Sequence, residues 1–308
     1  MSATTMSAVR VKQYGGPEAL TLESVPRPQP QDGQVLLRVV AAGVNPVDWK
    51  MRAGLYKDFM PLQFPWTPGI EGAGIVEAVG SGVTAFEPGQ SVFGAFGGSY
   101  AEYAVAAAQD VRRKPPHISF EQAAGVTVGG RTALQAVEDA KIEPGQHVLV
   151  HGAAGGVGAF VVQLACLNGA HVIGTSSARN ADFVRSLGAE QVIDYGTAKF
   201  ETAVKNVDVV VDTVGGELIE RSWSVLRPGG LLITVAGRLT PEMGTAHGVK
   251  AASVSRAGPD KVGRIAELLE AKQIVSSVGA VLPLAEARQA HQLSQTGHGR
   301  GRIVLLTA

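Results

Sequence analysis

The segment His147–Gly174 decides the fold, and it begins HVLVHGAAGGVG (residues 147–158). An apolar run of strand length is followed by a glycine-rich turn, an apolar run of helix length and a second strand at His171–Gly174. This order predicts a βαβ unit. Glycine allows a tight turn whose backbone approaches a ligand, and the free N–H groups that open the next helix attract phosphate. The turn therefore predicts a dinucleotide site at Gly152, Ala153, Gly155, Gly156, Val157 and Gly158. Its spacing differs from G-x-G-x-x-G, and a plain strand-to-helix turn is the alternative.

The residues after the second strand bear on the choice between the two nicotinamide cofactors. An NAD site usually has an Asp or Glu about 20 residues beyond the glycines, where it binds the ribose 2′-hydroxyl. Here residues 175–180 contain no acid, while Ser176, Ser177 and Arg179 offer hydroxyls and a guanidinium that suit a 2′-phosphate. We therefore predict NADP(H). Ser177 can also cap the helix that follows it, and the two roles are compatible.

Length and composition limit the class of protein. The 308 residues suffice for two domains, and the 27 Lys and Arg balance the 27 Asp and Glu, so no net charge favours nucleic acid or an anionic membrane. Cys166 is the only cysteine, which excludes an intramolecular disulfide and a Cys-based zinc cluster and favours a cytoplasmic setting. No apolar run reaches membrane-spanning length. We expect the small, polar residues 1–7 to be disordered.

The pattern of elements divides the chain into three parts. Up to about residue 125, short strands separated by turns predict an irregular, mainly β domain. Strands and helices then alternate, which implies a parallel doubly wound sheet. In that part we expect helices at 120–137 and 218–226 and a strand at 231–235. Apolar positions at Val262, Ile265, Ala266 and Leu269 predict a further helix. Residues 274–308 hold a strand, a helix and a final strand.

Five segments, in this order, resemble the medium-chain dehydrogenase/reductase family and its zinc-free, quinone oxidoreductase-like branch: Ala41–Asp48, Pro68–Val76, Gly152–Gly158, Asp208–Gly216 and Gly299–Val304. The resemblance covers nearly the whole chain. It implies an α/β protein with a GroES-like β domain (1–125 and 274–308) and an inserted Rossmann domain (126–273), with the active site in the cleft. It also implies a homodimer formed through an edge strand of the Rossmann sheet.

Catalytic zinc is not expected in this chain. Zinc-containing relatives bind the metal with a Cys, a His and a second Cys or an Asp, and the corresponding positions here are Asn45, Ile70 and Ala124. Isoleucine and alanine cannot bind a metal ion, and the four-cysteine structural zinc loop is missing. His147 and His151 lie about 13 Å apart if they share one strand, too far to bind one ion. We expect them, like His291, to be satisfied or solvent-facing.

Without a metal, a conjugated acceptor is easier to reduce than a simple carbonyl. Hydride from C4 of NADPH can reach a quinone or the β-carbon of an enone, and the protein then needs a hydrogen-bond donor at the oxygen. The resemblance implies two catalytic residues, Asn45 beside the nicotinamide and Tyr56 near the substrate carbonyl. A turn at Asn45-Pro46 and a packing aromatic at Tyr56 are the alternatives. We expect Asp48 to stabilise the loop.

The resemblance implies further contacts with the cofactor. Thr127 and Thr132 occupy positions that meet the phosphates or the nicotinamide ribose, and Tyr195 one that flanks the 2′-phosphate and adenine. Two further candidates follow the ends of strands: Val214, and Val235, Ala236 and Gly237. Arg302 resembles a near-terminal Lys or Arg that approaches the cofactor. Ligands bind at the carboxyl ends of strands in open α/β sheets. Ordinary strand-end packing, and a surface position for Arg302, are the alternatives.

These observations favour an NADPH-dependent reductase of small quinones or α,β-unsaturated carbonyls. An enoyl-thioester reductase or a biosynthetic tailoring reductase is a second enzyme interpretation. A protein that binds NADPH for stability and acts as a structural or interaction partner is a third, since a fold does not fix a function.

Overall fold

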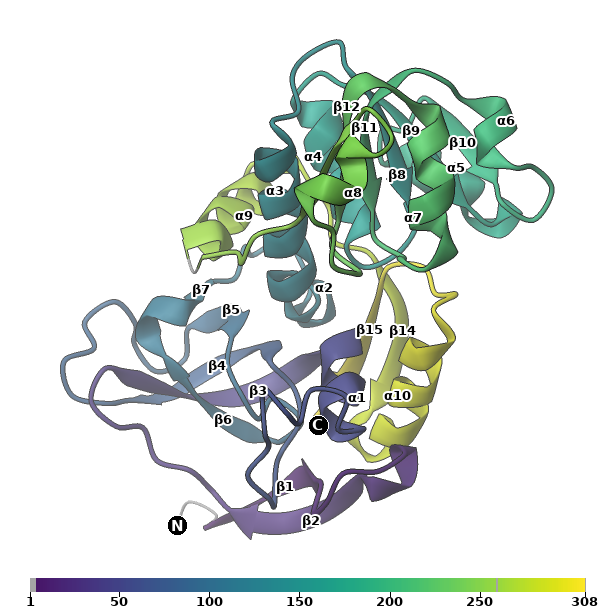
Figure 1. Cartoon of the computed structure of the whole chain (residues 1–308). Coiled ribbons are helices and arrows are strands. Elements are labelled where there is room, and N and C mark those ends of the chain that lie inside the picture. The colour runs from purple at the N-terminus through teal and green to yellow at the C-terminus, as the bar shows by residue number, and fades with distance from the viewer. Residues whose placement is uncertain (1–3, 259, 308) are drawn as a thin grey trace. The chain divides into compact units, whose positions relative to one another are not determined.

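The computed structural model describes residues 4–258 and 260–307 and divides into two compact units. Unit 1 contains the residues up to Val128, Val262–Glu270 and the segment from Ser276 onward. Unit 2 contains Gly129–Lys261 and Ala271–Val275. Figure 1 shows the elements of both units, and each unit is described below on its own.

Unit 2 is built on a six-stranded sheet in which every neighbouring pair of strands is parallel. Its order is β10-β9-β8-β11-β12-β13, so the chain starts in the middle, moves to one edge and then fills the other side. This is the strand order of a dinucleotide-binding sheet, and it confirms the predicted doubly wound architecture. The strands are β8 (His147–His151), β9 (His171–Ser176), β10 (Gln191–Asp194), β11 (Val207–Asp212), β12 (Leu226–Thr234) and β13 (Lys250–Ser253).

Helices flank this sheet (Figure 1). The first after the glycine turn, α4 (Gly158–Leu167), is apolar on most sides and is buried from Gly158 to Ala165, as expected of a helix packed inside a domain. Leu149, Val210 and Leu232 from three neighbouring strands meet in the core. The remaining helices are α3 (Thr127–Ala140), which begins in unit 1, and α5 (Ala181–Ser186), α6 (Phe200–Ala203), α7 (Glu217–Ser222) and α8 (Pro241–Thr245).

Unit 1 is organised around one long strand, β3 (Gln34–Val44), which is almost continuously apolar and mostly buried. It pairs antiparallel with β15, β4 and β6, and lies in a sheet of order β14-β15-β3-β4-β5-β7. The C-terminal strands therefore complete the sheet that the N-terminal part begins. The strands of this unit are β1 (Thr5–Arg10), β2 (Thr21–Pro26), β4 (Glu71–Val79), β5 (Ser91–Ala95), β6 (Tyr103–Ala107), β7 (Val111–Arg113), β14 (Val278–Pro283) and β15 (Arg302–Leu306).

Four helices accompany unit 1: α1 (Pro46–Arg52), α2 (Phe120–Ala124), α9 (Asp260–Glu270), whose first two residues belong to unit 2, and α10 (Ala287–Thr296). The amphipathic α10 buries Ala287, Ala290 and His291 and ends at Gly297, which adopts the left-handed conformation that glycine accepts readily. No helix among the described residues is long and apolar enough to cross a membrane.

Several expected boundaries were wrong. The helix expected at 120–137 is interrupted at Gly125, where a Cβ would lie 2.7 Å from Cγ of Arg302, so the chain must pass that side chain without one. The helix expected at 218–226 ends at Ser222, and β12 begins before the turn-like Pro228-Gly229-Gly230. Thr5–Ser7 belong to β1, whereas residues 1–3 lie outside the described residues. In α9, Leu268 is buried and Ala266 only half-buried.

Candidate active site

The glycine turn of unit 2 forms a backbone cradle between β8 and α4. Gly152 has a φ of 68°, and a Cβ on Gly158 would lie 2.2 Å from the carbonyl oxygen of Gly152, so both positions require glycine. The amides of Gly152 and Ala153 bond back to Thr175, at 3.4 Å to its Oγ1 and 3.1 Å to its carbonyl oxygen. The amides of Gly156, Val157 and Gly158 donate to no described group, so the start of α4 offers free donors to an anion.

Asp212, the last residue of β11, fixes the loops that follow β11 and β12 at the carboxyl edge of the sheet. Its buried carboxylate accepts hydrogen bonds from the amides of Val214 and Gly215 and from the Thr234 hydroxyl, at 2.7–3.1 Å. Thr213 donates to the carbonyl oxygen of His151, which ties this loop to the start of the glycine turn. Val214 and Val235 therefore follow adjacent strand ends, as the sequence predicts.

His151 is buried and neutral beneath the glycine turn. Ser222 donates its hydroxyl proton to the carbonyl oxygen of Leu218, so its Oγ is free to accept from Nε2 of His151 at 3.0 Å. The Thr175 hydroxyl can then donate to Nδ1 at 3.2 Å. Burial lowers the pKa of His151 to about 4, against the opposing effect of Asp212. The histidine is a satisfied structural group, which is one of the two roles expected from the sequence.

On the other side of the glycine turn, the ends of β9 and β10 bring together the residues predicted to bind the 2′-phosphate. Ser176 pairs with Asp194, and the amide of Tyr195 donates to the carbonyl oxygen of Ser176. Tyr195 is 56% exposed, and Arg179 is exposed as well. Ser176 itself is buried, with its hydroxyl on the carbonyl oxygen of Ser177. Ser177 does not cap α5: it precedes a short 3₁₀ turn, and Asn180 is the N-cap residue.

A cavity of about 250 Å³ lies at the ends of β12 and β13. Three predicted cofactor residues line it, namely Thr132, Val235 and Gly237. The neighbouring Ala236 is exposed. Two arginines that the sequence reasoning did not single out as candidates, Arg131 and Arg256, line the same cavity.

In unit 1 the predicted catalytic Asn45 is part of a buried network with Glu71 and Arg302. Nδ2 of Asn45 donates to Oε1 of Glu71 at 2.8 Å, and Arg302 donates to Oδ1 of Asn45 and to the same Glu71 oxygen. The other Glu71 oxygen accepts from the amide of Val128 at 2.7 Å. All three side chains are at most 5% exposed. Arg302 is therefore not a surface residue, and one Nδ2 hydrogen of Asn45 remains uncommitted.

Glu71 was missed as a site residue although it lies in one of the recognised segments. The signal was available: a carboxylate within the glycine-rich apolar strand Gly69–Val79 must have a partner if it is buried. The glycines around it make room for it, since a Cβ on Gly43 would lie 2.6 Å from Oε1 of Glu71.

A second buried chain of polar groups continues from Asn45 to helix α10. Asn45 does not lie in a plain turn: it is the N-cap of α1, and its amide donates to Oδ2 of Asp48 at 2.8 Å, which supports the loop-stabilising role expected for Asp48. The Tyr100 hydroxyl lies 3.4 Å from the same oxygen and 3.2 Å from Nε2 of His291. Burial raises the pKa of Asp48 to about 7 and lowers that of His291 to about 3. Burial, and then the charge of Asp48, raises the pKa of Tyr100.

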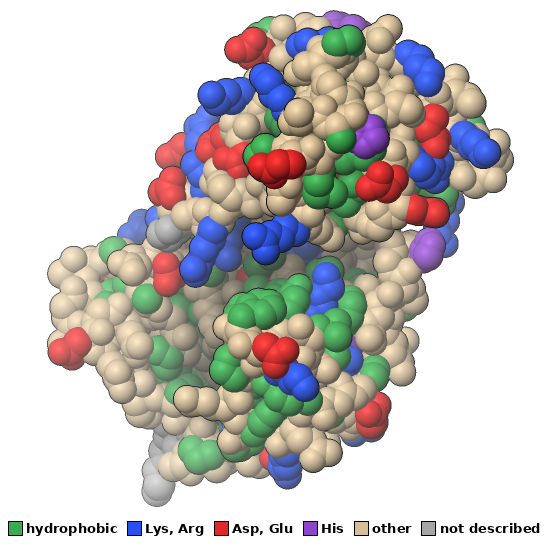
Figure 2. All heavy atoms as spheres, in the orientation of Figure 1, with side chains coloured by type: hydrophobic (Ala, Val, Ile, Leu, Met, Phe, Trp, Pro, Cys, Tyr) green, Lys and Arg blue, Asp and Glu red, His purple; other side chains and the backbone are tan. Residues whose placement is uncertain are grey.

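Tyr56 lies in the turns that follow α1, where it is half-buried and its ring is 5.1 Å from that of Phe59. Its hydroxyl has no hydrogen-bond partner among the described residues. Leu55, Phe59 and Met60 beside it are exposed, and Figure 2 shows hydrophobic side chains gathered in the region of α1. Thr127, the first residue of α3, is instead buried, with its hydroxyl unpaired. Four of the predicted site residues belong to unit 1, namely Asn45, Tyr56, Thr127 and Arg302. The other predicted site residues belong to unit 2.

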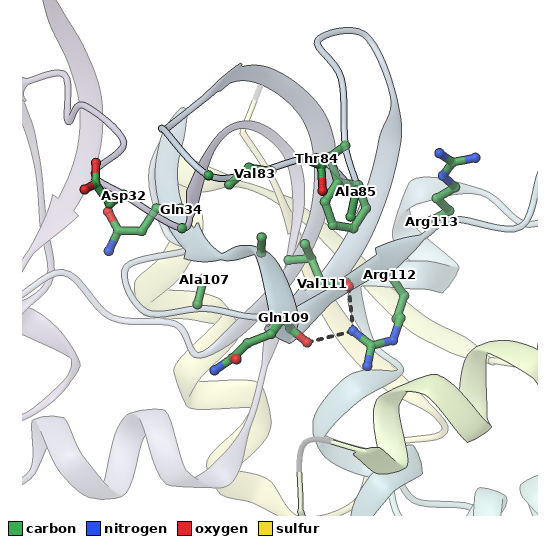
Figure 3. A pocket seen from close by; sticks show the side chains of 14 residues that line it. Asp32, Gln34, Val83, Thr84, Ala85, Ala107, Gln109, Val111, Arg112 and Arg113 are labelled. Atoms are coloured by element: carbon green, nitrogen blue, oxygen red, sulfur yellow. Dashed lines mark hydrogen bonds between the residues drawn. The ribbon is translucent and has the colours of Figure 1, made fainter.

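A larger cavity of about 830 Å³ in unit 1 contains none of the predicted site residues. Figure 3 shows it between the loop around Val83 and the segment from Ala107 to Arg113. The Arg112 guanidinium turns back to donate to the carbonyl oxygens of Gln109 and Val111. The Arg112 guanidinium is therefore already used by the protein, and we assign this cavity no role in the chemistry.

The residues at the zinc-ligand positions do not fit a metal ion. The Asn45 amide is bound to Glu71 and Arg302, Ile70 has a hydrocarbon side chain, and Ala124 is buried and has no donor atom. Within residues 4–258 and 260–307, no group of three or more His, Cys, Asp or Glu side chains could hold a metal ion.

Comparisons with known proteins agree with this architecture. Residues 31–116 match a family model described as the alcohol dehydrogenase GroES-like domain, and residues 187–305 match one described as zinc-binding dehydrogenase. The chain is 34% identical to a quinone oxidoreductase of Sus scrofa, over 98% of each protein. A two-domain oxidoreductase of the alcohol dehydrogenase type is the class that these matches define. The chain belongs to the medium-chain dehydrogenase/reductase family, as the sequence predicts, and its curated relatives include quinone oxidoreductases.

Solved structures give the same result. The quinone oxidoreductase from Coxiella burnetii has a TM-score of 0.89 and 33% identity, and it covers 99% of this chain and 100% of its own. A mycobacterial protein, Rv1454c, solved in complex with NADPH, has a TM-score of 0.88 and 32% identity, over 98% and 100%. The enoyl reductase CurK has a TM-score of 0.90 and 27% identity, over 98% and 99%. The protein is therefore an oxidoreductase with a GroES-like domain and a Rossmann domain.

Proposed function

We propose that this oxidoreductase binds NADP(H) and transfers hydride, without zinc, to small quinones or α,β-unsaturated carbonyls. The observation that carries the proposal is the carboxyl edge of the unit 2 sheet, where a glycine cradle with free amides lies beside a strand end that carries hydroxyls and an arginine but no acid. The NADPH complex of a relative at 32% identity supports the same cofactor.

Different residues along the carboxyl edge of the unit 2 sheet would bind different parts of the cofactor. The amides of Gly156, Val157 and Gly158 would bind the pyrophosphate, where the positive end of the α4 dipole favours an anion. Ser177, Arg179 and Tyr195 would bind the 2′-phosphate and the adenosine. Val214, Val235 and their neighbours at the ends of β11 and β12 would contact the nicotinamide end. When bound, the cofactor supplies the hydride.

In unit 1 we assign different roles to Asn45 and Tyr56. The Asn45 amide is fixed by Glu71 and Arg302, so its remaining N–H is an oriented donor that needs no reorganisation. The Tyr56 hydroxyl is half-buried and unpaired, which suits a donor to the substrate oxygen as negative charge develops there. Asn45, Thr127 and Arg302 are all buried, and we keep their contacts with the cofactor as a proposal.

The test is NADPH oxidation with a panel of quinones, alkenals and enoyl thioesters. Turnover with quinones or alkenals is expected, as the curated relatives suggest. Activity that depends on a thioester carrier would instead support the enoyl reductase alternative, which the likeness to CurK favours. NADPH binding without oxidation of any acceptor would leave only the interpretation as a binding protein.

Tyr56→Phe separates the two roles of this residue, because the ring stays and only the donor is lost. If the hydroxyl stabilises the developing oxyanion, kcat should fall by about 10² or more, with NADPH affinity and thermal stability nearly unchanged. Enones should lose more than quinones, since an enone needs a proton at carbon after hydride arrives. A Phe variant within about threefold of the wild type on both substrates, with Tyr56→Ala raising KM, would leave Tyr56 as a packing residue.

Assembly as a homodimer is part of the proposal. The six-stranded sheet has two free edges, β10 and β13, and a second copy could extend it at either one. Light scattering of the purified chain distinguishes a dimer from a monomer.

A further inference from the structure

A single carboxylate on helix α3 holds the loop that follows β13. The Asp139 carboxylate accepts a hydrogen bond from the amide of Ser255 at 2.7 Å and one from the Ser255 hydroxyl at 3.1 Å, across 116 positions of sequence. Gln135, one helical turn earlier on α3, donates to the same carboxylate at 2.8 Å and so restricts its rotation. We call these three hydrogen bonds the Asp139 anchor. All of its residues belong to unit 2.

The loop depends on this anchor because it has few other attachments. Val254 donates its amide to the carbonyl oxygen of Thr234, at the end of β12. Among the residues that the structure describes, Ser255 is the last one of loop 254–257 with a hydrogen bond to another part of unit 2. The two residues that follow it, Arg256 and Ala257, are therefore positioned through Ser255.

The anchor is charged at neutral pH. Burial acts to raise the pKa of Asp139, but the amide of Ser255 and the Gln135 side chain outweigh it, and the pKa is lowered. Hydrogen bonds to an ionised acceptor are about twice as strong as those between neutral groups. This strength matters here, because Ser255 is exposed and water competes for its donors.

The anchored loop borders the cavity at the ends of β12 and β13. Its residues 254–257 line this cavity, and so do three residues that we assign to the cofactor: Thr132, Val235 and Gly237. Thr132 lies seven residues before Asp139 on α3, which is two helical turns, so the two residues share one face of the helix. Asp139 does not line the cavity, and any effect on a ligand there must pass through the loop.

We propose that Asp139 is a positioning residue for the nicotinamide cofactor, because it holds loop 254–257 in the conformation that borders the cofactor cavity. The inference rests on the proposed function and adds a residue that does not touch the cofactor. A loop that is already ordered costs less free energy to immobilise on binding, so the anchor should increase cofactor affinity. None of the residues assigned to the 2′-phosphate lines this cavity, so NADPH and NADH should be affected equally.

The experiment measures the dissociation constants of NADPH and NADH for the full-length protein by fluorescence titration, together with thermal unfolding. Asp139→Ala removes the anchor, whereas Asp139→Asn keeps an oxygen that can accept from the Ser255 amide. Ser255→Ala removes only the hydroxyl donor. Glu138→Ala is the matched control, because Glu138 is the neighbouring residue on α3 and pairs with Lys261 instead.

Asp139→Ala should raise both dissociation constants about tenfold or more, and by the same factor. Asp139→Asn should lie between this variant and the wild type, and Glu138→Ala should leave both constants unchanged. Ser255→Ala should have a smaller effect than Asp139→Ala. It should have none in the Asp139→Ala background, because the partner of the hydroxyl is then already missing.

Unchanged dissociation constants in Asp139→Ala would overturn the inference, even with a lower melting temperature, since Asp139 would then only stabilise the fold. A rise confined to NADPH would also overturn it, because the effect would lie at the 2′-phosphate. If Asp139→Ala does not fold, Asp139→Asn and Ser255→Ala decide by the same comparison with Glu138→Ala. If the wild type binds neither cofactor, the proposed function fails, and the inference falls with it.

Discussion

Asn45, Glu71 and Arg302 satisfy one another inside unit 1, and each comes from a different part of the chain. A buried carboxylate and a buried guanidinium are stable only as a pair with further hydrogen bonds, and here Asn45 and the Val128 amide supply these bonds. The pair therefore fixes the position of a proposed catalytic amide. Nε of Arg302 is buried without a hydrogen-bond partner. The loss of a further hydrogen bond to this guanidinium would therefore be costly.

Glu71→Gln should destabilise the protein by about 3–5 kcal/mol, because it leaves Arg302 charged and buried without its counter-ion. Chemical unfolding of the variant and the wild type measures this loss. Asp182→Asn is the control, since it breaks an exposed pair with Arg185 and should change the free energy of unfolding by less than about 1 kcal/mol. Equal effects of the two substitutions would contradict the network described here.

Asp48 gives the stability a pH dependence of defined sign. Its folded-state pKa of about 7 is above the ordinary value of 3.8, because burial outweighs the amide of Asn45 and the charge of Arg302, while Glu71 adds to the rise. The stability that protonated Asp48 contributes is complete below pH 4 and is lost as the pH rises through 7.

Asp48→Asn remains neutral at every pH and should remove this loss. The free energy of unfolding of the variant, relative to wild type, should rise between pH 4 and pH 7 and then level off. The change should be several kcal/mol, since each pKa unit corresponds to about 1.4 kcal/mol. Urea unfolding at a series of pH values measures the difference, in which the contributions of His151 and His291 cancel. A difference that falls with pH would show that Asp48 ionises readily in the fold.

Single residues of the site could be predicted only in part. Resemblance nominated Asn45 and Arg302, but their contact with Glu71 depends on the antiparallel pairing of β3 with β4 and β15, which no local pattern encodes. Arg131 and Arg256 lie 125 positions apart and line the same cavity, because α3 and the loop after β13 both border it. The sequence shows that each residue is charged, but it does not show that the two residues border the same cavity.

At the scale of elements, strands with strong apolar runs were predicted well, and junctions were not. The periodicity of β8, α4, β9 and β11 was clear because these elements are buried. Asn45-Pro46 was interpreted as a turn, although Asn at the N-cap and Pro at the first position also begin a helix, which is what α1 shows. Pro228-Gly229-Gly230 was likewise interpreted as a turn before a strand at 231–235, whereas β12 already begins at Leu226.

The residues that follow β9 determine the choice of cofactor in this account. NADPH should bind at least tenfold more tightly than NADH, about 1.4 kcal/mol, because the partly exposed Ser177 and the exposed Arg179 follow β9 and residues 175–180 contain no acid that would repel a 2′-phosphate. Arg179→Ala should remove most of that difference and leave NADH binding unchanged, as measured by fluorescence titration. Arg185→Ala, a charge on α5 paired with Asp182, is the control. Equal wild-type affinities for the two cofactors would remove the basis of the NADP(H) assignment.

For the whole molecule, the family followed from the sequence, because five segments spread along the chain together resemble it. The match with a quinone oxidoreductase covers 98% of the chain. The predicted domain boundaries, 125/126 and 273/274, stay a proposal. The loop after β13 lines a cavity, and the shape of such a loop does not follow from a local sequence pattern. Sequence alone therefore gives the class of chemistry and leaves the substrate to experiment.

The central claim is hydride transfer from NADPH to a quinone by a protein that needs no metal. The most direct measurement is a single turnover under anaerobic conditions, with chelator-dialysed protein, a neutral naphthoquinone, and NADPH carrying either hydrogen or deuterium at the transferred C4 position. We predict loss of NADPH absorbance well above the protein-free rate, one hydroquinone formed per NADPH, and slower transfer of deuterium. A rate no higher than without protein, or one that returns only when zinc is added, would contradict the account.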